Sequence, residues 1–593
     1  MKNFRKLVFL LSVVSLFLGT YFLPGCGRPV EQTPPKEELK ELRLPEPNGN
    51  VSTTPLLKLT PSEVQISVVL PSLAEGLDKL VALAKRFYNE DEVNSWVQAR
   101  IIEISSFAGV PEAKNLIEVA EARGFDISIP LGIYLNLSPS IESLLSMLSA
   151  QGGEGEGTQA GVVAKSIDEI DLTDITQPNW AVAIGVKDKN KVVESLKELV
   201  VEIPEISASA PKEEVVKGAQ VVSYGPYAYS VTAGYVVIGS ASTVKGIVSC
   251  FSEPLQVRYG TPEMPALDVS EGVIMLKDWE LIPMVEKLMP HIIKPYPATV
   301  GLQLKLSPWS DIAVSGEKDP VYICFSLLPN ERLIIRSLLD SSKKPKYVEL
   351  VGNAQPISLL KILPPSTQAS AFFQLTKEYR TYLEQNVLPD VKNNLTEKRE
   401  IAQGMQYATS FMRMFGNELG VGITGSIGDF PAVIVLIKAG ENAEMLKGFL
   451  DTMVPVAEEP EKHREVEIKK VALPSPVPVN LAMVKDVVVV SNNADIIKGT
   501  IDLVLDGGSS DYLKGLTPPV DAEIPRYTFV SLQSKLFLDV IFPLMSILGK
   551  DLGGAQRDVE SVLKQIRELR IMSEKRDGLV EGQIIFYFTP EAN

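Results

Sequence analysis

The chain has very little histidine and cysteine, since its 593 residues include 2 His and 3 Cys. Structural zinc sites and disulfide-stapled folds need larger sets of these residues, so zinc fingers, a multi-histidine metal centre and a disulfide scaffold are excluded. Basic residues are also in the minority, with 58 Lys and Arg against 74 Asp and Glu and a net charge of -16. Because such a surface repels phosphate backbones, nucleic acid is not an expected partner.

Hydrophobic residues, by contrast, make up 45% of the chain and charged residues 22%. A chain of this composition can bury a core, and its length predicts several globular domains or fewer large ones. A long apolar run lies at the N-terminus, from Leu7 to Phe22. Lys2, Arg5 and Lys6 precede it, and this order of charged and apolar segments is typical of a secretory signal. We therefore expect the protein to be exported.

The residues directly after the apolar run, Leu23-Pro24-Gly25-Cys26, resemble the lipobox of bacterial lipoproteins. The resemblance implies that residues 1–25 are removed and that Cys26 carries a diacylglycerol; an ordinary signal peptide with an incidental cysteine is the alternative. Acyl chains contribute about 0.8 kcal/mol per buried methylene and would hold the protein at a membrane. Gly27 after the cysteine implies the periplasmic face of the outer membrane or, in a single-membrane organism, the outer face of the cell membrane.

A proline-rich stretch follows the cysteine. Residues 26–60 contain the segment PPKEELKELRLPEPNGN, which has no sustained apolar period. Composition of this kind is typical of a semi-extended spacer. We interpret it as a tether between the lipid and the folded body.

Patterns in the body occur twice in the same order. The strand around Ala181 and its helix KNKVVESLKELV match the strand around Ala432, 251 residues later, and its helix ENAEMLKGFLDTMV. The strand that begins at Tyr235 matches the one that begins at Val487, 252 residues later, and each precedes a helix with a Lys-Gly pair. A single match between apolar strands could arise by chance, but an ordered series favours an internal repeat.

A third match pairs the strand Val321 to Leu327 with Gln583 to Phe588. Together the matches predict a tandem duplication, with repeats at residues 61–345 and 346–593. Alternating strands joined by turns such as Gly225-Pro226 predict antiparallel pairing. With the interspersed helices, the expected fold class is α+β, in two tandem lobes.

Three features of this arrangement resemble a family of exported bacterial proteins known as a domain of unknown function, the DUF3352-type proteins. They are the opening ILPPST at Ile362 to Thr367, the Pro-Ala strand from Pro431 to Lys438, and the hairpin around Gly218 and Tyr224. The first repeat departs from the pattern, since Thr60-Pro61-Ser62-Glu63 lacks the closing Thr. No catalytic or ligand residue is known for the family, so the resemblance assigns none here.

Two motifs have the spacing of catalytic or binding sites. Gly420, Gly422 and Gly425 are spaced like a dinucleotide-binding fingerprint, but a helix is expected before them and a strand after them, which reverses the required context. We interpret them as a flexible turn. Ser242 lies one helical turn before Lys245, as in penicillin-binding enzymes. Because the aligned residue of the second repeat is Asp495, we interpret both as caps at a helix start.

The remaining candidates have structural explanations of their own. His291 and His463 lack triad spacing, and Asp168, Asp171 and Asp174 lack the spacing of a calcium loop. Cys250 and Cys324 could form a disulfide in an oxidising compartment or simply be two buried small side chains. An apolar group, Phe411, Met412, Met414 and Phe415, could line a lipid pocket, although its helical spacing favours core packing. No cofactor and no metal site is expected.

The sequence thus predicts a lipid-anchored envelope protein without a catalytic centre, acting as a binding or scaffolding module for an unknown envelope protein. The alternatives are a carrier of an apolar ligand, such as a lipid or a lipoprotein, between its lobes, and an envelope hydrolase. An exposed apolar patch would favour the scaffold, an enclosed apolar cavity the carrier, and convergent carboxylates with raised pKa values the hydrolase.

Overall fold

The computed structural model describes residues 54–57, 59–150, 179–202, 209–232, 234–252, 272–292, 313, 317–352, 354–382, 385, 416–427, 430–472, 477–543, 554–576 and 579–590. These form two compact units, an N-terminal unit up to residue 337 and a C-terminal unit from residue 338 onward. Cys26, most of the predicted tether, the acidic residues Asp168, Asp171 and Asp174, and the apolar residues 411–415 lie outside the described residues.

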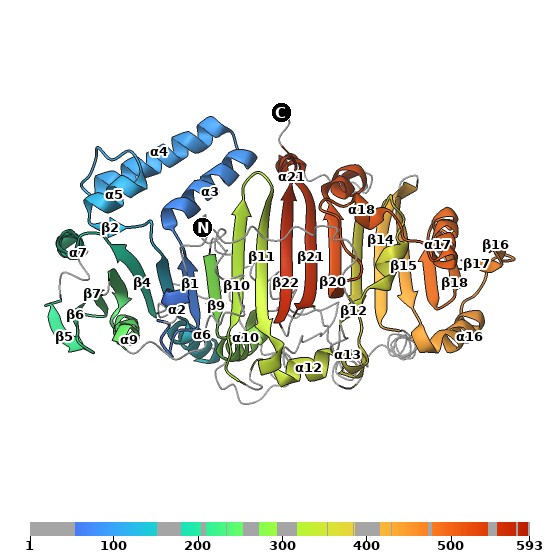
Figure 1. Cartoon of the computed structure of the whole chain (residues 1–593), viewed down its shortest axis with the longest axis horizontal. Coiled ribbons are helices and arrows are strands. Elements are labelled where there is room, and N and C mark those ends of the chain that lie inside the picture. Colours follow the sequence, from blue (N-terminus) through green and yellow to red (C-terminus); the bar gives the residue numbers. More distant parts are fainter. Residues whose placement is uncertain are drawn as a thin grey trace, which may run out of the picture. The chain divides into compact units, whose positions relative to one another are not determined.

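The N-terminal unit is built on an antiparallel sheet (Figure 1). Its strands follow the order β5 (Lys212–Val216), β6 (Ala219–Tyr224), β7 (Tyr227–Thr232), β8 (Tyr235–Ser240), β4 (Asn179–Val186), β3 (Leu131–Asn136), β1 (Ile66–Leu70), β9 (Gly272–Leu276) and β10 (Val321–Leu328). The short β2 (Phe125–Asp126) pairs with the end of β4. The strand β11 spans Arg332–Asp340.

The C-terminal unit is also built on antiparallel strands. Its strands follow the order β16 (Glu461–His463), β17 (Val466–Val471), β18 (Val479–Val484), β19 (Val487–Ser491), β15 (Phe430–Lys438), β14 (Glu418–Ile427), β13 (Ala369–Gln374), β20 (Pro525–Gln533), β21 (Ile566–Arg576) and β22 (Leu579–Phe588). The short β12 (Gln355–Pro356) pairs with β20. Helices and antiparallel strands occur together in both units, so the predicted α+β class is confirmed.

The strands of the two units have the same connectivity. In each unit the first long strand, β1 or β13, lies inside the sheet, and the chain reaches the outer four strands before it returns to the other side of that strand. This order pairs β4 with β15 and β8 with β19, as the sequence matches do. In the strand order the equivalent of β10 is β21. The third sequence match paired β10 with β22 instead, so it is shifted by one strand. The tandem duplication itself stays a prediction.

Helices of the N-terminal unit are α2 (Thr54–Leu57), α3 (Leu73–Phe87), α4 (Glu90–Phe107), α5 (Leu116–Ala122), α6 (Ser138–Ala150), α7 (Lys189–Glu202), α9 (Ala241–Ser252) and α10 (Asp278–Ile292). Those of the C-terminal unit are α12 (Pro345–Val351), α13 (Lys377–Tyr382), α16 (Ala443–Met453), α17 (Ala494–Asp506), α18 (Tyr512–Gly515), α19 (Ser534–Leu536) and α21 (Gly554–Gln565). The unit also has the short 3₁₀-helices η4 (Ser341–Lys343), η5 (Ser358–Ile362) and η7 (Gly440–Asn442) and the short π-helix η8 (Phe537–Ile541). Within the described part of the chain, no helix is both long and apolar enough to span a bilayer.

One core cluster of each unit lies where an amphipathic helix covers the outer strands, because residues spaced by three or four share one helix face. In the N-terminal unit, α7 covers strands β6 to β8 through a cluster of Val192, Leu196, Val222, Tyr229 and Val236. In the C-terminal unit, α16 covers β15, β18 and β19 through Ile437, Leu446, Leu450, Leu481 and Val488. The buried part of the N-terminal unit also includes α2, where Leu56 and Leu57 are buried. The body therefore begins before the expected boundary at residue 61.

We predicted a flexible turn at the glycine motif of residues 420–425, and this prediction was wrong. These residues lie inside strand β14. Gly420 pairs with Phe372 of β13, and a Cβ on Gly420 would lie 2.1 Å from a carbon of the Phe372 ring. Gly425 has a φ of +108 at the point where the register shifts between Ile423 and Ser426. These glycines therefore make room for a ring and for a bulge.

Candidate functional site

Three consecutive helices of the N-terminal unit, α3, α4 and α5, form a helical arm (residues 73–122). Local sequence fixes where each helix starts: Ser72 Oγ accepts from the amide of Glu75 at 3.2 Å, and Asn89 Oδ1 accepts from the amide of Asp91 at 2.9 Å. Asn115 Oδ1 accepts from the amide of Glu118 at 2.9 Å. Side-chain caps of this kind satisfy free amides of the first turn and favour acidic residues there.

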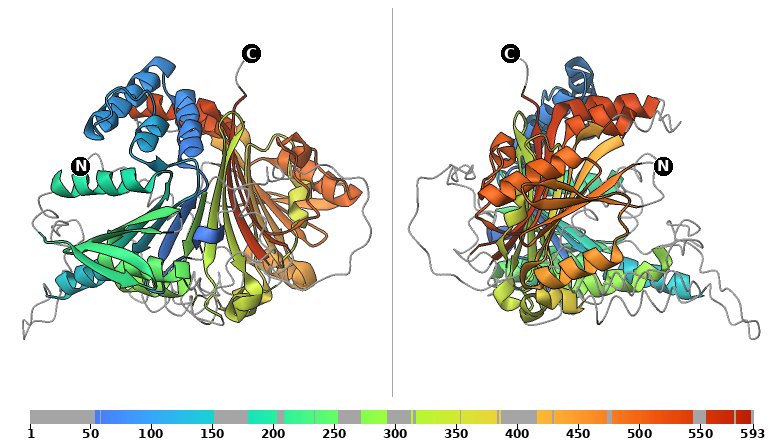
Figure 2. Two further views of the ribbon diagram at one scale, coloured as in Figure 1. Left: turned by 60° about the vertical axis from the view of Figure 1, so that its left-hand side comes forward. Right: turned by 90° about the vertical axis from the view of Figure 1, so that its right-hand side faces the viewer.

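The arm is poorly covered by the rest of its unit. Figures 1 and 2 show α3 and α4 lying beside each other beyond the end of the sheet. The sequence of α3, LAEGLDKLVALAKRF, has an apolar face, yet none of its residues is buried. In α4, Val93, Ile101 and Ser105 are buried, and these lie on one side of the helix. An amphipathic helix normally buries its apolar face against a core, so α3 departs from that pattern.

Large apolar side chains are exposed on the arm. The six are Leu80, Tyr88, Trp96, Ile102, Ile104 and Ile117, with exposed fractions from 42% to 69%. Elsewhere among the described residues, five such side chains are exposed, namely Val215, Tyr227, Met445, Val456 and Val562. A concentration of exposed apolar groups in one segment marks an interaction surface, whereas scattered ones are ordinary. The arm is therefore the candidate binding surface of the chain.

Charged groups beside these apolar side chains are paired with one another. Lys79 lies 3.0 Å from Glu75, and Lys85 lies 2.9 Å from Glu90 and lowers the pKa of that carboxyl by hydrogen bonding. Arg100 pairs with Glu103, and its guanidinium carbon lies 6.0 Å from the ring centroid of Trp96. Pairs of opposite charge reduce the field of the arm, so the surface that the arm presents is apolar rather than ionic in character.

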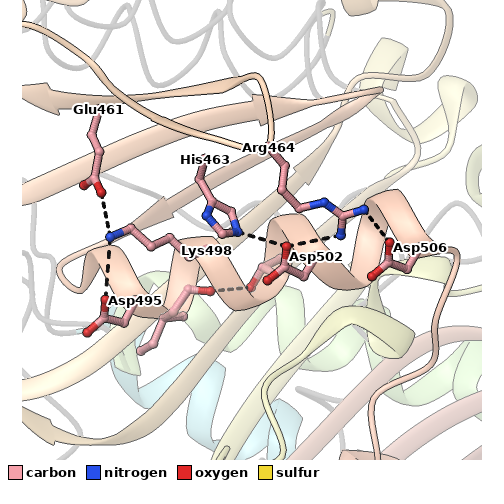
Figure 3. Close-up of polar contacts among 9 residues, drawn as sticks. Glu461, His463, Arg464, Asp495, Lys498, Asp502 and Asp506 are labelled. Atoms are coloured by element: carbon pink, nitrogen blue, oxygen red, sulfur yellow. Dashed lines mark hydrogen bonds and ion pairs between the residues drawn. The ribbon is translucent and has the colours of Figure 1, made fainter.

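His463, one of the two histidines, lies in a polar cluster between the β16–β17 hairpin and α17 (Figure 3). Its Nε2 lies 2.9 Å from Asp502 Oδ1, and Arg464 reaches Asp502 at 3.2 Å and Asp506 at 2.6 Å. At the other end, Lys498 lies 2.7 Å from Glu461. Hydrogen bonding from His463, followed by that from Arg464, lowers the pKa of Asp502.

A lowered pKa keeps the carboxylate of Asp502 ionised, whereas a general acid needs a raised one. Hydrogen bonding from Arg464 lowers the pKa of Asp506 in the same way. The cluster joins an edge hairpin to the helix beneath it, and we interpret it as a structural clasp. His291 lies in α10. Among the described residues, no three metal-ligating side chains gather closely enough to hold an ion.

A second polar cluster, which sequence reasoning missed, joins η5 to strands β14 and β15. Lys438 Nζ donates to Ser358 Oγ at 2.7 Å, and Ser358 Oγ donates to the carboxylate of Glu418 at 3.0 Å. A Ser-Lys pair is a known nucleophile arrangement, but the base must be a free amine. Here the Lys438 nitrogen also lies 3.2 Å from Glu418, in an ion pair. Because 80 residues separate Ser358 from Lys438, no local motif could have revealed the contact.

The serine at the start of α9 does not cap its helix, so that prediction was wrong. Ser242 is the second residue of α9, it is exposed, and Lys245 pairs instead with Glu214 at 2.5 Å. In α17 the cap is Asn493, whose Oδ1 accepts from the amide of Asp495 at 2.8 Å. Asp495 is thus a first-turn residue, where a negative charge suits the helix dipole.

The two cysteines of the described residues, Cys250 and Cys324, are buried and not bonded to each other. Burial, and secondarily the charge of Glu63, raises the pKa of Cys250 to about 11. Nearby, the buried Lys277 donates from Nζ to the carbonyls of Pro61 at 3.0 Å and Ser62 at 2.6 Å. A protonated thiol is a poor nucleophile, so the buried small side chain is the interpretation of Cys250 that this structure supports.

No protein-family model and no curated protein matches the sequence. Two solved structures are similar, titled "Structure of crystal form I of TP0453" and "Structure of crystal form IV of TP0453". Each is 9% identical to this chain and covers 49% of it, with 79% and 81% of the other chain included. Their TM-scores are 0.22 and 0.20, values too low to support a conclusion about function.

Proposed function

We propose that this chain is a lipid-anchored protein of the bacterial cell envelope that acts as a non-catalytic binding or scaffolding module, with the helical arm as its binding surface. The observation that carries the proposal is the gathering of exposed apolar side chains on residues 73–122. The charged-then-apolar N-terminus that ends in Leu-Pro-Gly-Cys26 supports the anchor.

The polar clusters favour binding over hydrolysis. Around His463 the aspartates have lowered pKa values, and the Lys438 nitrogen near Ser358 is in an ion pair. A hydrolase needs a base that is free to accept a proton and an acid that is protonated near neutral pH. These arrangements instead have the chemistry of links between secondary-structure elements.

The anchor is tested by metabolic labelling with an alkyne-tagged fatty acid in the native host. The unaltered protein should take up the label, and Cys26→Ser should not, because the thiol that forms the thioether is gone. Label retained by the Cys26→Ser protein, or missing from the unaltered one, would refute lipidation at this residue.

The arm is tested by complementation of a deletion strain. A variant with Leu80→Asn, Tyr88→Asn and Trp96→Asn should fail to rescue, since it removes exposed apolar surface without touching a buried residue. The matched control carries Val215→Asn, Met445→Asn and Val562→Asn, whose side chains are 42% to 75% exposed but lie elsewhere. It should rescue, as should Ser242→Ala, His291→Ala, His463→Ala and Ser358→Ala. If one of these four single variants fails to rescue while the protein is folded and anchored, the protein is an enzyme rather than a binding module.

A further inference from the structure

We infer that the partner of the helical arm is the lipid bilayer itself, and that the arm rests in the interfacial layer of the membrane that holds the acyl anchor. The inference rests on the proposed function, because it uses the anchor to bring the arm to the membrane. It goes further by naming the partner as a lipid surface rather than a protein.

The chain enters the body in the same unit that carries the arm. Thr54–Leu57 form α2, which packs on β1 and β3, and Tyr134 OH donates to the carbonyl of Leu56 at 2.9 Å. Twenty-seven residues lie between Cys26 and Thr54. At about 3 Å per residue they reach up to about 80 Å, whereas a five-residue strand such as β1 spans roughly 17 Å. The tether is thus long enough for the arm to meet the membrane.

Tethering also lowers the affinity that the arm needs. A group held near its partner by a flexible linker encounters it at an effective concentration in the millimolar range. A few partly inserted side chains are then sufficient, and a deep hydrophobic face is not required. The six exposed apolar side chains of the arm are sufficient for weak binding of this kind.

The apolar groups of α4 point to several sides of the helix. At about 100° per residue, Trp96 and Ile102 lie about 120° apart around the axis, on the half of α4 that faces away from the buried Val93 and Ile101. Ile104 lies between Val93 and Ile101 around the axis and is 42% exposed. The outward half of α4 therefore offers an apolar group at each edge, and a fluid layer of acyl chains and headgroups can cover both.

The electrostatics of the arm indicate which lipids it tolerates. Residues 73–122 contain five Lys and Arg and nine Asp and Glu, and three of the basic residues pair with glutamates of the same segment. An excess of acid does not attract anionic headgroups, so binding should come from apolar insertion. We therefore expect the arm to bind zwitterionic membranes and to be insensitive to salt.

Two aromatic residues suit an interfacial depth. Tyr88 and Trp96 are the most exposed large apolar side chains of the arm, and each has an apolar ring with a polar group. Such rings are enriched at the headgroup level of membranes. Arg100, beside the Trp96 ring, can direct its guanidinium toward water while its stem stays in the layer.

The test uses the lipidated mature protein reconstituted into phosphatidylcholine vesicles, with and without brominated phosphatidylcholine, which quenches tryptophan on contact. Bromolipid should quench part of the emission, more when the bromine is near the headgroup than at the chain end. Trp96→Phe should lose this quenched component. Trp180→Phe and Trp279→Phe, which remove half-buried rings of the same unit, should retain it.

A second pair of variants keeps Trp96 as the reporter. Leu80→Gln with Ile102→Gln should reduce quenching, whereas Met445→Gln with Val562→Gln, at residues 53% and 42% exposed in the C-terminal unit, should leave it unchanged. Quenching should also persist at high salt and should not increase with anionic lipid. Circular dichroism of each variant confirms that the fold is intact.

The outcomes separate this inference from the proposed function. Absence of quenching of Trp96 in an anchored, folded protein overturns the membrane-docked arm, and a photocross-link from residue 95 to a protein would then identify a protein partner while the binding module stands. Quenching that requires anionic lipid overturns the apolar mode of binding. Failure of fatty-acid labelling at Cys26 instead refutes the anchor, on which both proposals depend.

Discussion

Arg526 and Glu574 form an ion pair inside the C-terminal unit, with Arg526 Nε donating to Glu574 Oε1 at 2.7 Å and both side chains 1% exposed. They face each other across β20 and β21. Arg570 and Glu568 form a second buried pair on β21, joined at 2.9 Å, and the Arg570 guanidinium lies 4.8 Å from the ring centroid of Tyr587. Charges so far from water persist because each has its counter-charge.

Replacing one partner of the first pair should destabilise the unit severely. Glu574→Ala leaves the Arg526 charge buried without its carboxylate, and we expect a loss of about 3–5 kcal/mol in the free energy of unfolding. Urea unfolding of the purified protein measures it. The control is Glu349→Ala, which removes the exposed partner of Lys346 and should cost less than about 1 kcal/mol. Equal effects of the two variants would contradict the buried pair.

The thiols of Cys250 and Cys324 should be unreactive in the native protein. Burial raises the pKa of Cys250 to about 11, and Cys324 is also buried, so neither should react with a thiol reagent at neutral pH. In denaturant, the lipidated protein should show two thiols of the three in the sequence, because Cys26 is then a thioether. Three reactive thiols in denaturant would mean that Cys26 is unmodified, and reaction in the native state would mean that Cys250 or Cys324 is accessible.

The buried Lys277 should make the free energy of unfolding depend on pH in the alkaline range. Burial lowers the pKa of its ammonium from the ordinary 10.5, so between the folded-state value and 10.5 the unfolded chain binds more protons than the folded one. The contribution of this group to stability therefore rises as pH rises through that window. We expect the unfolding free energy of the unaltered protein, minus that of Lys277→Met, to increase as pH rises through this range. If this difference stays constant or decreases with pH, the pKa of Lys277 is not lowered by burial.

The two compared helix starts should respond differently to alanine. Asn493→Ala removes the side chain that caps α17 and should cost about 1 kcal/mol. Ser242→Ala at the second residue of α9 should be nearly neutral, because Ser242 is an exposed residue inside the helix rather than its cap. Thermal unfolding of both variants measures this. A larger loss from Ser242→Ala would show that it stabilises the helix start after all.

Local sequence determined much of the secondary structure. Alternating residues gave β4 its alternation of buried and half-buried side chains, and the Gly225-Pro226 turn joins β6 to β7 as expected. The matches around Ala181 and Ala432 fall on strands with equivalent places in their sheets. These features depend on periods of two or 3.6 residues and on turn residues, which a single segment contains.

Contacts between distant segments decided the rest. Gly420 and its neighbours belong to a strand because Phe372 of the adjacent strand fills the space that a side chain would occupy. Likewise the partners of His463 lie about 40 residues away on α17, and no spacing rule relates them. Such outcomes follow from which surfaces meet, a property of the assembled fold.

The helical arm shows the division most clearly. The sequence LDKLVALAKRFY determines a helix with one apolar face, and for most helices such a face is covered by the core. Whether it is covered depends on the surface that the rest of the unit presents, and here the sheet ends before it can bury α3 or the outer sides of α4. The sequence by itself therefore determined the helices and their apolar residues, and only the tertiary structure decided that the apolar face of α3 stays at most half-buried, with Leu80 and Tyr88 exposed.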